Sequence, residues 1–254
     1  MAKRQKVTKG VKGTRLSKRI LYLFVGLVTY PGLYIFNRLR INGMERLSKL
    51  PRQNVLFVCN HHTYFADVIT LIHIFCAANN GRKKKLGWPF YLFRPFLNIR
   101  YVAAATTMSK TMVARFFTLA GAITVKRTWN PDSGENRKGL ELADTRAISR
   151  ELEENWVITF PQGTTTPYAP GRRGAAFIIK QNHPIVVPVV FKGFSDTFDK
   201  TGLKIRNWRS KLEVTFKEPM QINYEDSAED ILVQIMDAIE QSEKYKDSNV
   251  QLVQ

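Results

Sequence analysis

The feature of the sequence that most restricts the fold is an almost continuous apolar run at residues 54–59, NVLFVC. A strand with one face in water alternates apolar and polar side chains, whereas a strand covered on both faces is apolar nearly throughout. Residues 183–191, HPIVVPVVF, form a second run of this kind. We therefore expect both segments to be inner strands of a sheet that has helices on its two faces.

Helical patterns lie between these runs and other, shorter predicted strands. Residues 66–78 are apolar on every side, as in a buried helix, and residues 139–155 have a helical period with charges of both signs. Ser227 and Asp230 form a capping-box-like start to a helix near the C-terminal end. Shorter strands are expected near residues 40–44, just after Gly121, and at 156–160 and 210–216. The alternation predicts one α/β domain, a mixed sheet flanked by helices.

The first part of the chain differs from the rest in composition. The net charge is +18, and the first nineteen residues hold eight basic side chains and no acidic one. Residues 20–36 then carry no charge, with Pro31 and Gly32 as a break. We expect residues 1–40 to be a basic tail and a membrane-embedded helix pair in one leaflet, and residues 41–254 to be the α/β domain. A buried hairpin is the alternative for the apolar stretch.

The apolar run leads into CNHHTYFAD, residues 59–67, where Asp67 follows His62 by five residues. On a continuous helix of about 3.6 residues per turn, this spacing would place the two side chains about 140° apart. They can face each other only where a strand end turns into a helix start, as predicted here. Asp67 would then hold one imidazole nitrogen of His62 and leave the other as a base. We expect His61 to lack such a partner; a histidine that only caps a loop is the alternative.

Four sequence blocks in this order resemble those of the glycerolipid acyltransferase family, whose best-known members are 1-acyl-sn-glycerol-3-phosphate acyltransferases. In that family the blocks are Asn-His-x4-Asp, Gly-x5-Arg, Phe-Pro-Glu-Gly-Thr-Arg and a proline-bearing strand. The corresponding residues here are Asn60 or His61 with His62 and Asp67, then Gly121 with Arg127, residues 160–165, and residues 184–188. The resemblance covers residues 40 to 220, and the apolar front end resembles the family's membrane-embedded helix pair.

Three positions depart from the family pattern. Gln162 replaces the usual glutamate, Thr165 replaces the usual arginine, and Ala104 stands where many members have lysine. Two cations that could hold a phosphomonoester are therefore missing. Either the acceptor headgroup is not a phosphate dianion, or other basic residues bind it, namely Arg127, Lys126, Arg172 or Arg173.

The resemblance implies transfer of a fatty acyl group from acyl-CoA or acyl carrier protein to the hydroxyl of a lysolipid such as 1-acyl-sn-glycerol-3-phosphate. His62 would be the general base, and Asp67 would orient it. The protein would be associated with the cytoplasmic face of a membrane and would interact with its lipids. No cofactor and no metal are expected, since the histidines and cysteines have no metal-site spacing. The residues expected to bind substrate are Arg127, Gly121, Gln162, Gly163, Thr164, Thr165 and Arg173.

Other functions remain open from the sequence. The acceptor could be a phosphate-free lysolipid, such as an acylated amino acid. The basic tail also fits a non-catalytic protein that binds an anionic membrane or nucleic acid. No nucleic-acid partner is expected, because no recognised motif or aromatic-rich basic groove is present. A lipid hydrolase is disfavoured because the sequence has no Gly-x-Ser-x-Gly elbow.

Overall fold

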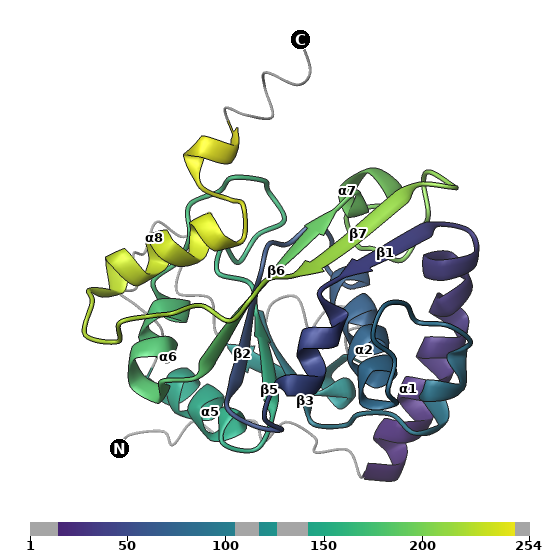
Figure 1. Ribbon diagram of the computed structural model, residues 1–254, viewed down its shortest axis with the longest axis horizontal. Helices are drawn as coiled ribbons and strands as arrows, with labels where there is room; N and C mark the ends of the chain where they lie inside the picture. The colour runs from purple at the N-terminus through teal and green to yellow at the C-terminus, as the bar shows by residue number, and fades with distance from the viewer. Residues whose placement is uncertain (1–14, 105–116, 126–141, 247–254) are drawn as a thin grey trace, which may run out of the picture.

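One mixed sheet forms the centre of the molecule (Figure 1). The computed structural model describes residues 15–104, 117–125 and 142–246. Within them, seven strands have the spatial order β1-β7-β6-β2-β5-β3-β4, and neighbouring strands are parallel except for β6 and β7. The predicted mixed sheet flanked by helices is confirmed. The strands are β1 (Arg38–Asn42), β2 (Val55–Cys59), β3 (Ile99–Ala104), β4 (Ala122–Val125), β5 (Trp156–Thr159), β6 (Ile185–Lys192) and β7 (Lys211–Phe216).

Helices cover both faces of the sheet. In Figure 1, α1 and α2 lie on one side of it, and α5, α6 and α8 lie on the other. Short helical turns connect these layers. The helices are α1 (Arg15–Tyr30), α2 (Ala66–Asn79), α5 (Leu142–Leu152), α6 (Gly174–Asn182), α7 (Phe194–Thr197) and α8 (Ala228–Ala238), and the turns are η1 (Pro31–Ile35), η2 (Met44–Lys49) and η3 (Pro89–Phe93).

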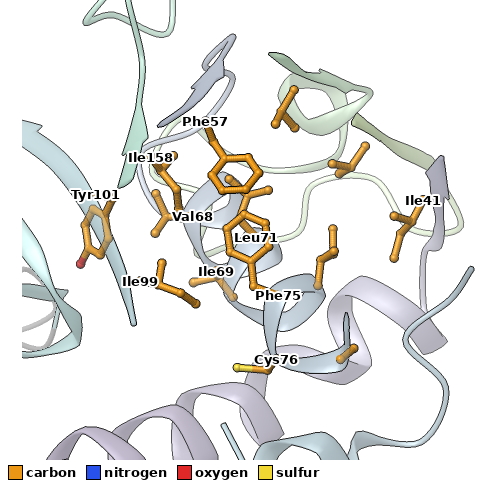
Figure 2. Close-up of a cluster of buried hydrophobic side chains, with 14 of the residues drawn as sticks. Ile41, Phe57, Val68, Ile69, Leu71, Phe75, Cys76, Ile99, Tyr101 and Ile158 are labelled. Carbon is orange, nitrogen blue, oxygen red and sulfur yellow. The ribbon is translucent and has the colours of Figure 1, made fainter. Parts of the chain in front are cut away.

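Strand β2 explains why the sequence there is apolar throughout. All five of its side chains are buried. Phe57 faces the layer of α1 and α2 and lies 4.7 Å, ring to ring, from Phe75 of α2 (Figure 2). Leu56 and Val58 point the opposite way, into the core beneath α5, α6 and α8. The strand is thus covered on both faces, and its end is fixed at the centre of the sheet.

The N-terminal segment differs from the predicted pair of helices. A single helix, α1, continues directly into η1, a five-residue π-helical turn that begins at Pro31. Proline has no N–H to donate to the preceding turn, and the wider turn closes instead with a hydrogen bond of 2.8 Å from Phe36 N–H to Pro31 O. The chain then enters β1, so no second helix forms. None of the described helices is long and apolar enough to cross a membrane.

The inner side of this segment belongs to the main core. Tyr22, Tyr30 and Leu33 are buried in the same cluster as the side chains of α2. The predicted boundary between residues 40 and 41 falls inside β1, which pairs with β7. One face of the segment is therefore packed on the core formed with α2, while its other face carries exposed apolar side chains.

Candidate active site

The turn between β2 and α2 is held to the sheet by Asn60. Its side-chain amide accepts a hydrogen bond from Phe191 N–H at 2.7 Å and donates one to Phe191 O at 3.0 Å. These two bonds extend the pairing of β2 with β6 by one residue, beyond Cys59 and Val189. The residues that follow are consequently fixed at the carboxyl edge of the sheet, where ligands bind in open α/β sheets.

Asp67 lies in the first turn of α2 and is fully buried. Its carboxylate accepts hydrogen bonds from the backbone N–H groups of His62 (2.7 Å) and Thr63 (3.1 Å) and from the Thr63 hydroxyl (2.8 Å). A fourth bond of 2.9 Å comes from Nδ1 of His61. Burial alone raises the pKa of Asp67, but these bonds, that from His61 first, hold it below its usual value. The group is thus a carboxylate whose charge is satisfied inside the protein.

The imidazole that pairs with Asp67 belongs to His61. Because Asp67 accepts at Nδ1, the neutral ring keeps its proton there and carries its lone pair on Nε2. Nε2 makes no hydrogen bond with any residue in the described ranges, and the side chain is 14% exposed. The ring is stacked on Phe160, with centroids 4.0 Å apart. Phe160 follows β5, the parallel neighbour of β2, so both side chains reach the same edge of the sheet.

The predicted hydrogen bond between the His62 imidazole and Asp67 is wrong. Residues 60–65 form an irregular turn rather than a helix, so helical spacing does not apply to them. The turn presents the backbone N–H of His62 to the carboxylate and folds the preceding side chain, that of His61, back over it. The expectation that His61 has no partner is wrong for the same reason.

The ring of His62 is enclosed by hydrogen-bond donors. Asn60 Nδ2 lies 3.1 Å from its Nε2, and Ser195 N–H lies 3.4 Å from its Nδ1. Burial lowers the pKa of His62; the charge of Asp67 opposes this in part, and the neighbouring His61 lowers the pKa further. A protonated ring would place an N–H against each of these donors. The surroundings of His62 therefore favour its neutral form.

The turn after β5 contains Gln162 and Gly163. The Gln162 side chain is buried, and its Nε2 donates to Ala169 O (3.0 Å) and to Gln241 Oε1 (3.1 Å), which connects the turn to the segment after α8. Gly163 has a left-handed φ of 62° and donates its N–H to Phe160 O at 2.9 Å. This glycine is needed for the turn, and its N–H is not available to a substrate.

Two hydroxyls and one cation lie on the outside of the same turn. Thr164 and Thr165 are partly exposed, and the Thr164 hydroxyl donates to that of Thr166 at 3.2 Å. Arg172 lies over Gly163, because a Cβ at position 163 would be 3.2 Å from Arg172 Nε. Arg172 is also joined to the turn by its N–H, which donates to Pro161 O.

The other predicted substrate-binding residues lie elsewhere. Gly121 precedes β4 with a φ of 122°, and a Cβ there would be 2.8 Å from Ile99 O, so its small size serves backbone packing beside β3. Arg173 forms an ion pair of 2.8 Å with Glu229 of α8, and both side chains are more than half exposed. Arg127 lies outside the described residues.

Sequence reasoning missed Phe160 as the stacking partner of His61, and it expected the bond to Asp67 from the imidazole of His62 rather than that of His61. The signal for Phe160 was its position directly after a buried strand. No group of side chains in the described residues has the composition of a metal site. Cys59 and Cys76 are buried free thiols.

The mixed sheet and the turn after β2 together define the class of this protein. It is an α/β protein with a histidine–aspartate pair, His61 and Asp67, at the carboxyl end of a central strand. The family profile described as Acyltransferase matches residues 38–192, more than half of the chain, and the chain belongs to the acyltransferase family. The resemblance to glycerolipid acyltransferases is confirmed.

One solved structure similar to this chain is that of the 1-acyl-sn-glycerophosphate (LPA) acyltransferase PlsC from Thermotoga maritima. The TM-score is 0.52, the identity is 13%, and the match covers 93% of this chain and 83% of that chain. At this identity the likeness supports the fold. A comparison with curated proteins found no match.

Proposed function

We propose that this acyltransferase moves a fatty acyl group from an acyl thioester, acyl-CoA or acyl carrier protein, to the hydroxyl of a lysolipid such as 1-acyl-sn-glycerol-3-phosphate. His61, rather than His62, is the general base. The observation that carries the proposal is the 2.9 Å bond from His61 Nδ1 to the buried Asp67, which leaves Nε2 as an acceptor at the carboxyl edge of the sheet.

The proposed reaction needs no covalent enzyme intermediate. His61 Nε2 takes the proton of the lysolipid hydroxyl while the hydroxyl oxygen attacks the thioester carbonyl carbon. Asp67 accepts the hydrogen bond from His61 Nδ1–H, so the proton stays on Nδ1, and the carboxylate stabilises the imidazolium that forms. The carbon–sulfur bond then breaks, and the leaving thiolate takes the proton from Nε2. An ester and a free thiol result, and His61 returns to its starting form.

The turn after β5 supplies the other proposed groups. The developing oxyanion requires a donor that is not already used. Gly163 N–H is bonded to Phe160 O, whereas Thr164 N–H makes no hydrogen bond with a described residue, so we assign the donor role to Thr164. Arg172, beside Gly163, is the cation assigned to an anionic headgroup. Arg127 remains a prediction for the same role.

We place part of the acyl chain at an apolar cavity between α1 and α2. It is lined mainly by aliphatic and aromatic side chains, including Leu21, Val25, Ile69, Ile72, Leu92 and Phe117. Phe117 also stacks on Phe65, at 4.5 Å, and Phe65 directly precedes α2. The cavity therefore adjoins the helix whose first turn carries Asp67. A chain held there would extend from the site toward the N-terminal helix.

The proposed membrane association, at the cytoplasmic face, is supported by the outer side of α1. Its exposed side chains repeat at helical spacing, and Arg15 and Arg19 near its start are exposed basic residues. Such a helix lies in the plane of a membrane interface, with its basic residues on the headgroups. The lipids would be both the support and the source of the acceptor. The exposed apolar residues of α1 are Leu16, Ile20, Phe24, Leu27 and Val28.

The acceptor headgroup is the finer part of the proposal. Gln162 has an internal reason to replace glutamate, because Nε2 faces two oxygen acceptors and a carboxylate there would be repelled. Its presence alone therefore does not require a changed headgroup. A phosphate-free or phosphodiester lysolipid is still a candidate, since Thr165 supplies no charge.

The test is an acyl-transfer assay with the intact protein, labelled acyl-CoA or acyl carrier protein, and a panel of lysolipids in vesicles. We expect acylated lysolipid as product, and the ratio of kcat/KM for lysophosphatidate against a lysophosphodiester and an acylated amino acid identifies the headgroup. Release of free fatty acid without acylated lipid would indicate a hydrolase. Absence of both products with every acceptor would overturn the proposal.

A further inference from the structure

The segment between α2 and β3 exposes three aromatic side chains. Trp88, Phe90 and Phe93 are 72%, 69% and 65% exposed, whereas their neighbours Tyr91 and Leu92 are buried. Aromatic residues of this size are normally covered in a soluble protein. Three of them within six residues form a surface that is unfavourable in water and favourable against an apolar partner.

This exposure is fixed by the fold. The Tyr91 hydroxyl bonds to Nδ1 of His73 in α2 at 2.8 Å, and the Tyr30 hydroxyl of α1 donates to Gly87 O at 2.8 Å. Leu92 packs so closely on α1 that a Cβ on Gly26 would lie 2.5 Å from it. The buried half of the segment is therefore anchored on two helices, and the exposed aromatic rings cannot turn inward.

Positive charge accompanies the aromatic rings. Four consecutive basic residues, numbers 82–85, precede Trp88, and Arg94 follows Phe93; all five are exposed. The sequence has no aspartate or glutamate between residues 68 and 131. Among the described residues, none of the five takes part in an ion pair. Residues 82–94, named here the aromatic segment, thus combine exposed rings with uncompensated cations.

The aromatic segment lies beside α1 and packs against the buried side of that helix. The two elements pack directly on each other at Gly26 and Leu92. The opposite helical layer exposes far less: Phe177 of α6 and Val233 of α8 are its large exposed apolar side chains within the described ranges. Exposed apolar surface is therefore concentrated on the side of the molecule that carries α1, at the right in Figure 1.

We propose that the aromatic segment is a second membrane-contact element, which binds an anionic lipid bilayer beside α1. Tryptophan and phenylalanine enter the interface between headgroups and acyl chains, and lysine and arginine bind anionic headgroups. The inference deepens the proposed function and rests on it in one respect, because the lysolipid acceptor would come from the same bilayer. An acidic protein such as acyl carrier protein would need the cations but not three exposed rings.

A polarity-sensitive fluorophore on the aromatic segment tests the proposal. Phe90→Cys supplies one accessible thiol, since Cys59 and Cys76 are buried and burial raises the pKa of both. Phe177→Cys, on the opposite layer, is the matched control. With vesicles containing anionic phospholipid, we expect a blue shift of the label at 90 and none at 177. Vesicle binding without a shift at position 90, or no vesicle binding, would overturn the proposal.

A second pair of variants tests the charges. Replacing the four basic residues 82–85 by glutamine should weaken binding to anionic vesicles by roughly tenfold or more. The matched variant, with arginine at positions 83–85, keeps the charge and should bind like the unaltered protein. Equal binding by the glutamine variant would contradict a role for these cations. A shift of the label at 90 with acyl carrier protein alone would assign the surface to that protein and overturn the lipid assignment.

The two proposals are distinguishable. A label that enters vesicles in a protein without acyl transfer would overturn the proposed function and retain the membrane contact. Trp88→Ser with Phe93→Ser should reduce turnover on vesicle-borne lysolipid, but not on a water-soluble short-chain lysolipid. If the double variant turns over both substrates as fast as the unaltered protein does, the aromatic segment has no role in catalysis on vesicles. That result would overturn its proposed place beside the acceptor.

Discussion

Two histidines on either side of the start of α2 have opposite environments. His61 precedes the helix, donates to a buried carboxylate, and has one ring nitrogen that no described residue occupies. His73 lies inside the helix, where Nδ1 meets the Tyr91 hydroxyl at 2.8 Å and Nε2 meets the Thr29 hydroxyl at 2.9 Å. Burial lowers the pKa of His73 to about 4. A charged partner and an open nitrogen suit a base, whereas two neutral partners and full burial suit a structural connection among α1, α2 and η3.

The largest expected effect follows from removing the base. His61→Ala should lower kcat by about 10⁴-fold, because the imidazole of no other described residue bonds to the Asp67 carboxylate. Thermal unfolding checks that the variant is folded, since the change also removes one of the four bonds to the buried Asp67 carboxylate and the stacking on Phe160. Single-turnover acyl transfer with a fixed thioester measures the loss. Near-normal turnover in the folded variant would contradict the assignment of His61.

Removing the charge of its partner should have the next largest effect. Asp67→Asn should lower kcat by about 10²–10³-fold, because an amide cannot hold both the Nδ1 proton of His61 and the N–H groups of the turn. Thr63→Val is the matched control, since it removes the two bonds between the Thr63 hydroxyl and Asp67 and leaves that from His61. A comparable loss in both variants would mean that Asp67 acts only through the shape of the turn.

His73 should affect stability and its pH dependence. Unfolded chains bind a proton at this histidine near pH 6.5, and the folded protein does so only near pH 4. Between these values the unfolded state holds more protons, so folding stability is retained above pH 6.5 and falls as the pH is lowered toward 4. The total loss is roughly 3 kcal/mol.

His73→Phe should therefore flatten part of the acid dependence of the unfolding free energy, although it lowers stability at neutral pH by about 1–3 kcal/mol, because both hydrogen bonds of His73 are lost and the buried Tyr91 hydroxyl loses its partner. Urea unfolding at several pH values measures both effects. His183→Asn, at an exposed position, is the control and should keep the original slope. Unchanged acid dependence in the phenylalanine variant would contradict the neutral state of His73.

The smallest effect is expected at His62. His62→Ala removes a ring that lies between Asn60 and Ser195, but it leaves the backbone N–H that Asp67 accepts. We expect less than about a tenfold change in turnover and about 1 kcal/mol in stability. Reversal of this order, with His62 essential and His61 dispensable, would restore the assignment that the sequence spacing favoured.

The sequence was sufficient where one local pattern determined the structure. The apolar run of β2 and the cap of α8, where Ser227 accepts from Asp230 N–H at 3.1 Å, were both predicted. Two elements were not. Strand β3 is only partly buried over its second half, and α6 begins at Gly174 without a side-chain cap, so neither has a strong local signal.

The histidine that bonds to Asp67 could be identified only from the three-dimensional path of the turn. Residues 199–204 fold against it, with Lys200 O and Thr201 O accepting from the N–H groups of Tyr64 and Phe65. Gly202 approaches so closely that a Cβ would lie 2.5 Å from Ala66 N. These contacts come from more than a hundred residues further along the chain. No spacing rule within residues 59–67 contains that information.

The edge pair β1–β7 has a consequence for how the chain is made. Asn37, just before β1, accepts from Ser210 N–H, and the two residues are 173 positions apart. At the usual rate of about 5–20 residues per second, a ribosome needs roughly 10–30 seconds to reach the partner strand after β1 has been synthesised. Throughout that time the inner side of α1 has no finished core to cover it, and in the folded protein the described residues leave its outer side exposed. The N-terminal helix is therefore available to a lipid surface before the rest of the protein has folded.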